Sequence, residues 1–193
     1  MALQNYWVEP IEYGVARPFV EKWHYSKNTN GIKIYKCFGL FRPTDLGFPE
    51  LVGAMIYGEP AMNHQASKWN PSNPSKCIEL RRLCCIDDTP KNAESFFIGG
   101  TFKWLRKNTD MELIISYADP MYGHEGTIYK ATNFTHAGLT APGIVIMLDG
   151  KKYHDRTLRM NKPYAQEVRR RHALGETTVV KTLPKHIYTY RLR

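Results

Sequence analysis

Asp119 is the carboxylate of this sequence that is best placed for acid–base chemistry. It follows a short apolar run, Met111 to Tyr117, which is typical of a strand covered on both faces, and Pro120 comes directly after it. Ligands of open α/β sheets bind at the carboxyl ends of such strands. We therefore interpret Asp119 as a base or an orienting acceptor for a substrate, and an Asp that only caps the next turn is the alternative.

Two hydroxyl groups lie close to Asp119 in the sequence. Ser116 is at the end of the apolar run, where its hydroxyl can hydrogen-bond a substrate. Tyr129 falls in a short helix that we predict over residues 126–132, and its phenol can also bind a substrate. The alternative for Tyr129 is a core tyrosine that packs at helical spacing.

Arg81 and Arg82 are adjacent in an apolar run, Cys77 to Cys85, that we predict as a strand. Because neighbouring strand residues point to opposite faces, we expect one arginine to lie buried beside Glu79 or Asp119 and the other to bind phosphate. A structural salt bridge is the alternative.

His24 and Tyr25 follow a helix that we predict over residues 15–23. We interpret His24 as a second base or, together with Asp119 and a tyrosine, as part of an Fe²⁺ site. The alternative is a histidine that interacts only with the dipole of the preceding helix.

The elements around these residues predict a mixed α/β fold. Thr89 and Pro90 are typical of a helix start, and the apolar residues from Phe97 to Leu105 recur at helical spacing, so strand 77–85, this helix and strand 111–117 should form a crossover in one sheet. We expect a single domain over 1–193, with a central twisted sheet of six or seven strands and helices on both faces. The other expected elements are strands 34–41, 51–57, 143–148, 151–154 and 187–192, a hairpin at Asp149-Gly150, and a helix from Tyr164 to Gly175.

Residues 59–76 contain three prolines and show no periodicity, so we predict a long loop there. Trp69 lies in the middle of this stretch, and an aromatic side chain in such a place must pack or stack on something. We interpret the loop as a substrate contact, with a structural lid as the alternative.

The excess of positive charge lies at one end of the chain. Residues 1–88 carry 10 Lys and Arg against 9 Asp and Glu, residues 89–150 carry 5 against 6, and residues 151–193 carry 12 against 3. A basic segment on a neutral body indicates a polyanion partner, and a role in solubility alone is the alternative. The plausible phosphate contacts are Lys151, Lys152, Arg169, Arg170 and Arg171, with a solvated helix face as the alternative for the arginines.

The remaining composition excludes several protein classes. The sequence has no apolar run long enough to cross a membrane, and its first residues lack the pattern of a secretory signal, so we expect no membrane partner. The four cysteines have the spacing of neither a zinc site nor a disulfide framework. We expect them to be buried free thiols of a cytosolic protein.

Four motifs together resemble a known family. They are WHYS at 23–26, ELRRLCC at 79–85, SYADP at 116–120 and GTIYKATNF at 126–134. In this order they are similar to the Mom proteins of Mu-like phages, which have a GNAT acyltransferase-like fold. The resemblance implies an enzyme in the cytoplasm of the bacterial host that converts the N6 amine of adenine in double-stranded phage DNA to an acetamido (carbamoylmethyl) form, which protects the DNA from host restriction.

The resemblance also implies roles for single residues. Asp119 would assist the adenine amine, and Tyr129 corresponds to the tyrosine that protonates the leaving thiolate in GNAT enzymes. It places Arg81, with Ser116, His24 and Tyr25, in the catalytic site. Because the target amine is paired inside a duplex, we expect the adenine to be flipped out, with Trp69 as a stacking surface.

An acyl donor such as acetyl-CoA is implied by the GNAT resemblance. Its phosphates would lie at the start of the helix after residue 90, with Lys91, Asn92 and Arg82 as the candidate contacts. The stretch 87–95 departs from the GNAT pattern, because it has no glycine and carries three carboxylates. An ordinary acetyltransferase of a protein or small amine, and a non-catalytic DNA-binding protein on the same fold, are therefore alternatives.

Overall fold

The computed structural model describes residues 3–61 and 63–193. These residues divide into two compact units. The first comprises residues up to Tyr117 together with Gly126–Ala137 and Ile187–Arg193, and the second comprises Ala118–Glu125 and Gly138–His186. Our expectation of one domain over 1–193 stays a prediction. No helix in the described part of the chain has the length and apolar character needed to cross a membrane.

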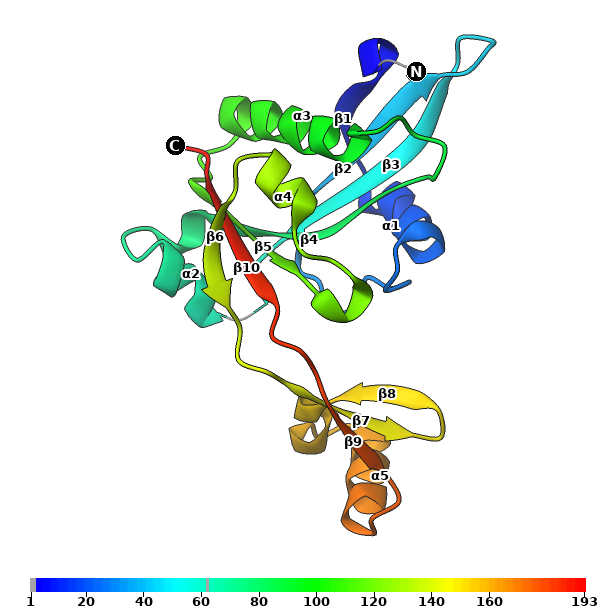
Figure 1. Ribbon diagram of the computed structural model, residues 1–193, viewed down its shortest axis with the longest axis vertical. Coiled ribbons are helices and arrows are strands. Elements are labelled where there is room, and N and C mark those ends of the chain that lie inside the picture. Colours follow the sequence, from blue (N-terminus) through cyan, green and yellow to red (C-terminus); the bar gives the residue numbers. More distant parts are fainter. Residues whose placement is uncertain (1–2, 62) are drawn as a thin grey trace. The chain divides into compact units, whose positions relative to one another are not determined.

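A seven-stranded sheet with the order β1-β2-β3-β4-β5-β10-β6 forms the centre of the first unit (Figure 1). Strands β1 to β4 pair with one another in antiparallel order, and β4 then pairs with β5 in parallel. The predicted crossover is therefore confirmed, with α3 between the two parallel strands. The strands are β1 (Trp7–Ile11), β2 (Ile34–Pro43), β3 (Pro49–Gly58), β4 (Cys77–Cys85), β5 (Leu113–Ala118), β6 (Thr135–Leu139) and β10 (His186–Arg191).

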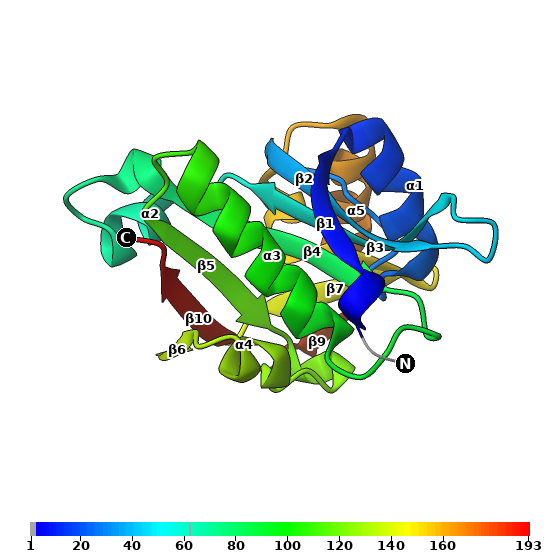
Figure 2. The same cartoon turned by 90° about the horizontal axis from the view of Figure 1, so that it is seen from above.

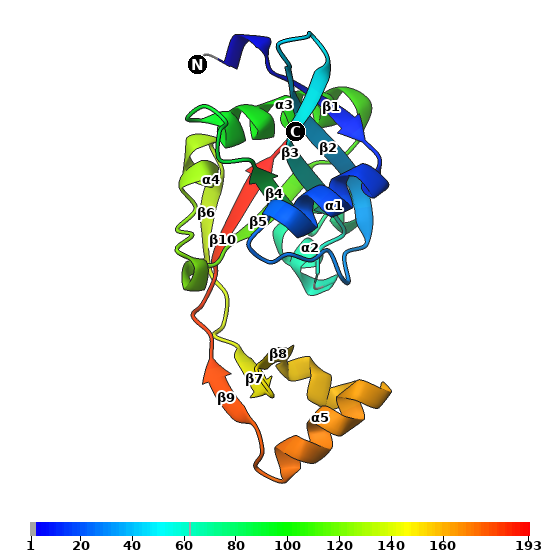
Figure 3. The same ribbon diagram turned by 90° about the vertical axis from the view of Figure 1, so that its right-hand side faces the viewer.

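Helices cover both faces of this sheet, as the sequence predicted (Figures 2 and 3). On one face, α1 buries Ala16 and Val20 against β2, β3 and β4, and α2 buries Ala66 against β4, β5 and β10. On the other face, Thr101 of α3 accepts or donates a 2.8 Å hydrogen bond with Tyr57 of β3. The helices are α1 (Tyr13–Trp23), α2 (Asn63–Trp69), α3 (Ala93–Asn108) and α4 (Thr127–Ala131), and the 3₁₀ turns are η1 (Leu3–Asn5), η2 (Pro74–Lys76) and η3 (Pro120–Tyr122).

The second unit contains a separate three-stranded sheet with the order β8-β7-β9. Asp149 and Gly150 both have positive φ, 50° and 72°, which confirms the predicted two-residue hairpin turn between β7 and β8. Helix α5 buries Val168 against Ile146 and Leu148 of β7. The elements are β7 (Ile144–Leu148), β8 (Lys151–His154), η4 (Asp155–Arg159), α5 (Pro163–Ala173) and β9 (Thr178–Lys181).

One expectation about the elements was wrong, and not every strand was predicted. The stretch 59–76 is not a plain loop, because it contains α2 and η2. Its prolines lie at positions 60, 71 and 74, beside or within these short elements, and they obscure the helical pattern of α2, which buries Gln65 and Ala66. Strand β1 was not predicted; it contains Pro10 and lies at the edge of the sheet, where a missing N–H is tolerated.

The prediction of buried free thiols is confirmed for three of the four cysteines, and Cys85 is half-buried. Cys37, Cys77, Cys84 and Cys85 are all free thiols, and the first three are buried. Burial raises the pKa of Cys37 to about 11 and the pKa of Cys77 and Cys84 to about 12. Thiols of this kind are protonated and unreactive at neutral pH, so they are not candidate nucleophiles.

Candidate active site

The candidate site begins where β4 and β5 stop pairing. Their parallel register joins Cys77, Ile78 and Glu79 to residues 113–115, and no later pair is formed between them, although β4 continues to Cys85 and β5 to Ala118. Backbone groups beyond Glu79 therefore need other partners. Side chains provide two of them, because the Leu80 carbonyl accepts from Ser116 and the Arg81 carbonyl accepts from Arg82.

Ser116 lies at this opening and joins the two strands through its side chain. Its Oγ is 3.1 Å from the carbonyl oxygen of Leu80 in β4 and 2.7 Å from the hydroxyl of Tyr129. The Ser116 hydroxyl donates to the Tyr129 hydroxyl or to the Leu80 carbonyl, and because it has one proton it serves one acceptor at a time. Ser116 therefore links β4 to α4, and the Tyr129 phenol keeps its own proton.

Tyr129 is buried in α4, and its phenol is protonated at neutral pH. Burial raises its pKa to about 12, and the hydrogen bond with Ser116 opposes this rise. A phenol with this pKa is a proton donor and not a base at neutral pH. The structure thus brings Ser116 and Tyr129 together, as the sequence interpretation requires, although which reaction they serve stays a prediction.

Tyr188 of β10 and Gly126 hold Tyr129 in place, and no local sequence pattern indicates either role. The rings of Tyr188 and Tyr129 have centroids 5.0 Å apart. A Cβ on Gly126 would overlap the Tyr188 ring, and Gly126 has a φ of +80°, so only glycine fits there. Gly126 is the N-cap of α4, and this close contact therefore fixes where the helix begins.

Arg81 is the extra residue of a β-bulge in β4. Its neighbours Leu80 and Arg82 pair with Tyr57 and Ile56 of β3, and Arg81 has no partner in that register. Its Nη1 donates a 3.0 Å hydrogen bond to Oε1 of Glu79, whose other carboxylate oxygen accepts the backbone N–H of Ala61 at 2.8 Å. Burial raises the pKa of Glu79, and Arg81 opposes that rise.

The bulge also changes the direction of the two arginines. We expected them to point to opposite faces, but Arg81 contacts Glu79, which binds the segment before α2, and Arg82 donates from Nε to the Asn28 carbonyl after α1 at 2.9 Å. Helices α1 and α2 cover the same face, so both arginines lie there. The buried Nε of Arg81 has no hydrogen-bond partner among the described residues.

His24 and Tyr25 follow α1 on this same face. The Nδ1 of His24 accepts the backbone N–H of Ser26 at 3.1 Å and lies 2.8 Å from the Ser26 hydroxyl. Because Nδ1 is an acceptor, the neutral imidazole carries its hydrogen on Nε2. The rings of His24 and Tyr25 are 4.2 Å apart; His24 is buried and Tyr25 is exposed.

Asp119 belongs to the second unit. It is the N-cap of η3, where its Oδ1 accepts the backbone N–H of Met121 at 3.1 Å. Its Oδ2 is 2.9 Å from Nζ of Lys185, so the carboxylate is held by a lysine that the sequence pattern did not indicate. The capping role, which was the alternative for this residue, is therefore present, and it leaves one oxygen for the lysine.

The N-terminus of α3 carries Lys91 and Asn92, the candidate phosphate contacts. Asn92 is the N-cap with a φ of 72°, and its side chain does not cap the helix. Asp88 is bound to Arg42 by two hydrogen bonds, and Glu94 occupies the first turn of the helix. With Asp87 beside them, these acidic groups outnumber the single nearby lysine, so the residues do not fit the diphosphate of coenzyme A well.

The structure does not support the predicted Fe²⁺ site. In residues 3–61 and 63–193, no three His, Cys, Asp or Glu side chains come together in a way that could hold a metal ion. His24 binds Ser26, and Asp119 binds Lys185 and the Met121 amide. We therefore do not assign iron to these residues.

The predicted nucleic-acid contacts differ in whether carboxylates of the protein already pair with them. Arg171 is bound to Asp149 and Glu176, and Arg170 is bound to Glu167. Among the described residues, Arg169 donates only to the Met160 carbonyl, at 3.2 Å. Lys151 and Lys152 are exposed on β8, and Lys152 lies 5.7 Å from the ring centroid of Tyr122. Trp69 is in α2 of the first unit, where its indole N–H donates to Gln65 at 3.0 Å.

Comparison with known proteins decides the family. A model of the Mom protein family matches residues 5–193. The chain belongs to the Mom protein family. A relative in this family, methylcarbamoylase mom of Escherichia phage Mu, is 29% identical over 184 residues, which cover 94% of this chain and 73% of that protein. The resemblance inferred from the four motifs is confirmed.

Solved structures confirm the GNAT-like fold of this Mom family member. NAA60 of Arabidopsis thaliana in complex with acetyl-CoA matches with a TM-score of 0.53 and 12% identity, covering 96% of this chain and 98% of that chain. The ribosomal-protein-S18-alanine N-acetyltransferase from Escherichia coli matches with a TM-score of 0.52 and 8% identity, covering 97% and 94%. At these identities the likeness shows the fold alone.

Proposed function

We propose that this chain is a DNA-modifying transferase that converts the N6 amine of adenine in phage DNA to its acetamido (carbamoylmethyl) form. Membership in the Mom protein family and the likeness to a protein named a methylcarbamoylase support this proposal. The reaction takes place in the cytoplasm of the bacterial host, and its product resists host restriction enzymes.

The observation that carries the proposal is the hydroxyl chain at the opening between β4 and β5. Group transfer to an amine needs a proton donor for the leaving group, and Tyr129 keeps its proton at neutral pH because burial raises its pKa to about 12. Ser116 donates to the Tyr129 hydroxyl or to the Leu80 carbonyl, which holds the phenol at the strand opening and leaves its own proton for transfer. When Tyr129 gives its proton to the leaving group, Ser116 turns to stabilise the phenolate.

The acceptor amine is assigned to the face that carries Arg81. The free Nε of Arg81 is a buried donor that binds an acceptor atom of the adenine ring. His24 and Tyr25 border the same face, and the Tyr25 ring is exposed for stacking. We retain Asp119 as the base that takes the proton of the amine as its nitrogen bonds to the transferred carbon.

The donor carries the carbamoylmethyl group with a leaving group on its methylene carbon, because attack on the carbonyl of an acyl donor such as acetyl-CoA would give an N6-acetyl product instead. The α3 N-terminus, with Lys91 and Asn92, is the candidate contact for its anionic part. Arg82, which the sequence placed beside them, lies on the opposite face and donates to the Asn28 carbonyl. Because the carboxylates near α3 disfavour a diphosphate, no step of this proposal passes through coenzyme A.

Double-stranded DNA is the proposed substrate, with the target adenine flipped out of the stack. Its phosphates bind the second unit at Lys151, Lys152 and Arg169, which the carboxylates of that unit leave unpaired among the described residues. Arg170 and Arg171 contribute less, since each is bound to carboxylates.

Mass spectrometry of nucleosides from plasmid DNA tests the proposal. Cells that express the chain should contain an adenine nucleoside heavier by one acetamido group, and cells that express Asp119→Ala should lack it. Unmodified adenine with the wild-type chain would contradict the proposal and favour an ordinary acetyltransferase or a binding protein. Asp119→Asn should still bind DNA, which separates lost catalysis from lost binding.

A further inference from the structure

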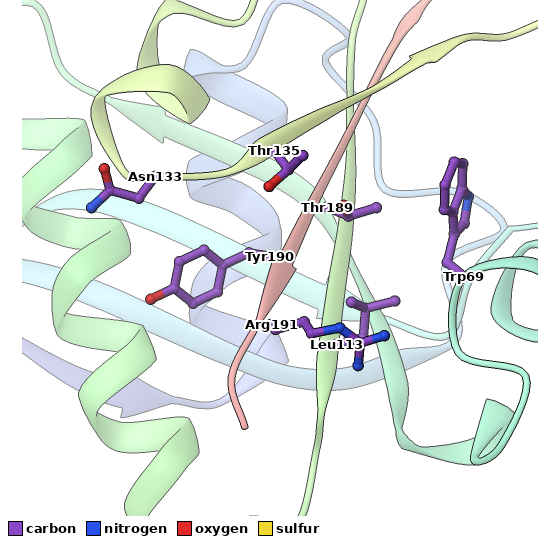
Figure 4. Close-up of a pocket in the computed structure, with 7 residues that line it drawn as sticks. All are labelled: Trp69, Leu113, Asn133, Thr135, Thr189, Tyr190 and Arg191. Carbon is purple, nitrogen blue, oxygen red and sulfur yellow. The ribbon is translucent and has the colours of Figure 1, made fainter.

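The first unit has a pocket at the end of β5 opposite the candidate active site (Figure 4). Leu113, which begins β5, lies in this pocket, and Ser116 is three residues away along the strand, roughly 10 Å at about 3.3 Å per residue. The pocket has a volume of about 500 Å³, which suits a small molecule or one nucleotide. It is lined by Trp69, Leu113, Asn133, Thr135, Thr189, Tyr190 and Arg191.

The pocket is cationic. No carboxylate is among its described lining residues, and Arg191 makes no ion pair in the described part of the chain. Lys68 adds a second cation, with Nζ 4.6 Å from the ring centroid of Trp69. Glu112 is next to Leu113 in the sequence, but its carboxylate is bound by Asn70, Asn73 and Lys76. The positive charges of Arg191 and Lys68 therefore favour an anionic ligand in this pocket.

The pocket also has an aromatic wall and free hydrogen-bonding groups. Trp69 packs on Leu113 and is held by its hydrogen bond to Gln65, so the indole is a fixed surface. Thr135, Thr189 and Asn133 make no side-chain hydrogen bond to described residues, and their polar groups are available to a ligand. In Figure 4 the Arg191 guanidinium extends over Leu113 toward the side of Trp69, and Tyr190 points the other way, where its ring stacks on Phe102 at 4.1 Å.

We propose that this pocket binds one nucleotide, with the base against Trp69 and the phosphate at Arg191. An aromatic surface beside a guanidinium is what a base and its phosphate require, and the threonine hydroxyls and the Asn133 amide complete the contacts to the sugar and base edge. The inference rests on the proposed function, because it assumes that nucleic acid is the substrate. Its ligand is a nucleoside monophosphate group, whether free or within a strand.

Calorimetric titration of the full chain tests this inference. The probes are dAMP, a single-stranded hexanucleotide, inorganic phosphate and an acidic hexapeptide. We expect dAMP or the hexanucleotide to bind, and Arg191→Met to weaken that binding about tenfold, as expected for a lost charge-assisted hydrogen bond. Tighter binding of dAMP identifies a free nucleotide, and tighter binding of the hexanucleotide identifies a strand; either result supports the inference.

Matched variants separate the pocket from general effects. Trp69→Leu should also weaken binding about tenfold by loss of stacking, whereas Trp23→Leu on α1 and Lys107→Met on α3 should bind as the wild type does. Circular dichroism checks that Trp69→Leu is folded. If Trp69→Leu does not fold, Arg191→Met still tests the inference, because it changes an exposed side chain. Equal binding of inorganic phosphate or of the acidic peptide would overturn the inference, as would wild-type affinity in Arg191→Met.

The proposed function and this inference can fail separately. If plasmid adenine is unmodified but dAMP or the hexanucleotide binds with the expected dependence on Trp69 and Arg191, the inference holds and the proposed reaction does not. If adenine is modified and neither nucleotide probe binds, the reaction stands and the nucleotide pocket is refuted.

Discussion

The two compact units place their polar side chains differently. In the first unit, Ser116, Tyr129 and Glu79 are buried at 0, 7 and 6% exposure, and each has a defined partner. In the second unit, the polar groups are mostly surface lysines and arginines around a small apolar cluster of Ile146, Leu148 and Val168. Buried polar groups orient a reaction, and exposed charges bind a polyanion, so the contrast assigns Ser116 and Tyr129 to chemistry and the exposed cations to DNA binding. Asp119 is the exception, because it belongs to the second unit and is buried.

The largest effect should follow from Arg81→Met. It leaves the buried Glu79 carboxylate without its cation, which costs about 3–5 kcal/mol of the free energy of unfolding at neutral pH. Because burial already raises the pKa of Glu79 above the ordinary 4.5, removal of Arg81 raises it further. The folded state then binds a proton more tightly than the unfolded state, so the loss should shrink as the pH falls through the raised pKa toward 4.5.

Urea unfolding at pH 8 and pH 5 measures this difference. The double variant Arg81→Met, Glu79→Gln removes the uncompensated charge and should regain most of the stability at pH 8. An equal loss at both pH values would show that Glu79 is not the cause.

A smaller effect on stability should follow from Gly126→Ala. The new Cβ would overlap the Tyr188 ring, and overpacking of this kind costs about 1–3 kcal/mol. Gly31→Ala is the matched control, because Gly31 has a similar φ of +73° and no atom lies within 4 Å of the position that its new Cβ would take. Thermal unfolding should show a larger loss for Gly126→Ala. The same loss in both variants would attribute it to backbone strain and not to contact with Tyr188.

The smallest effect concerns two neighbouring arginines of the second unit. Arg169→Gln should weaken DNA binding and reduce the slope of log affinity against log salt concentration by about 0.9, because one phosphate contact is lost. Arg171→Gln should leave that slope unchanged, since Arg171 is already bound to Asp149 and Glu176. Fluorescence anisotropy of a labelled duplex at several salt concentrations measures both. Equal slopes for the two variants would remove the distinction between them.

Much of the fold could be predicted from local patterns. The β4–α3–β5 crossover follows from apolar runs and helical spacing, and the Asp149-Gly150 turn follows from two residues that tolerate positive φ. Helix α2 was missed because it is only seven residues long and is bordered by prolines. Short elements that are stabilised by tertiary packing have weak sequence signals.

The candidate site was predicted only in part. The types and positions of Ser116 and Tyr129 indicated chemistry, and the structure brings them together. The pairing of Lys185 with Asp119, the contact of Tyr188 with Gly126 and the bulge at Arg81 join residues that are distant in the sequence or depend on strand register. No local pattern reports such contacts, so a single sequence could not reveal them.

The initial rate of adenine modification, measured at increasing concentrations of duplex DNA, tests most directly whether different residues carry out the chemistry and the DNA binding. Purified chain, with protein-free host extract as the donor source, is compared with Tyr129→Phe and with Lys151→Gln, Lys152→Gln, Arg169→Gln combined. Tyr129→Phe should lower the maximal rate about 100-fold or more and leave the half-saturating DNA concentration unchanged. The triple variant should raise the half-saturating concentration and keep the maximal rate. A fall in maximal rate with the triple variant, or a change in half-saturation alone with Tyr129→Phe, would contradict this separation.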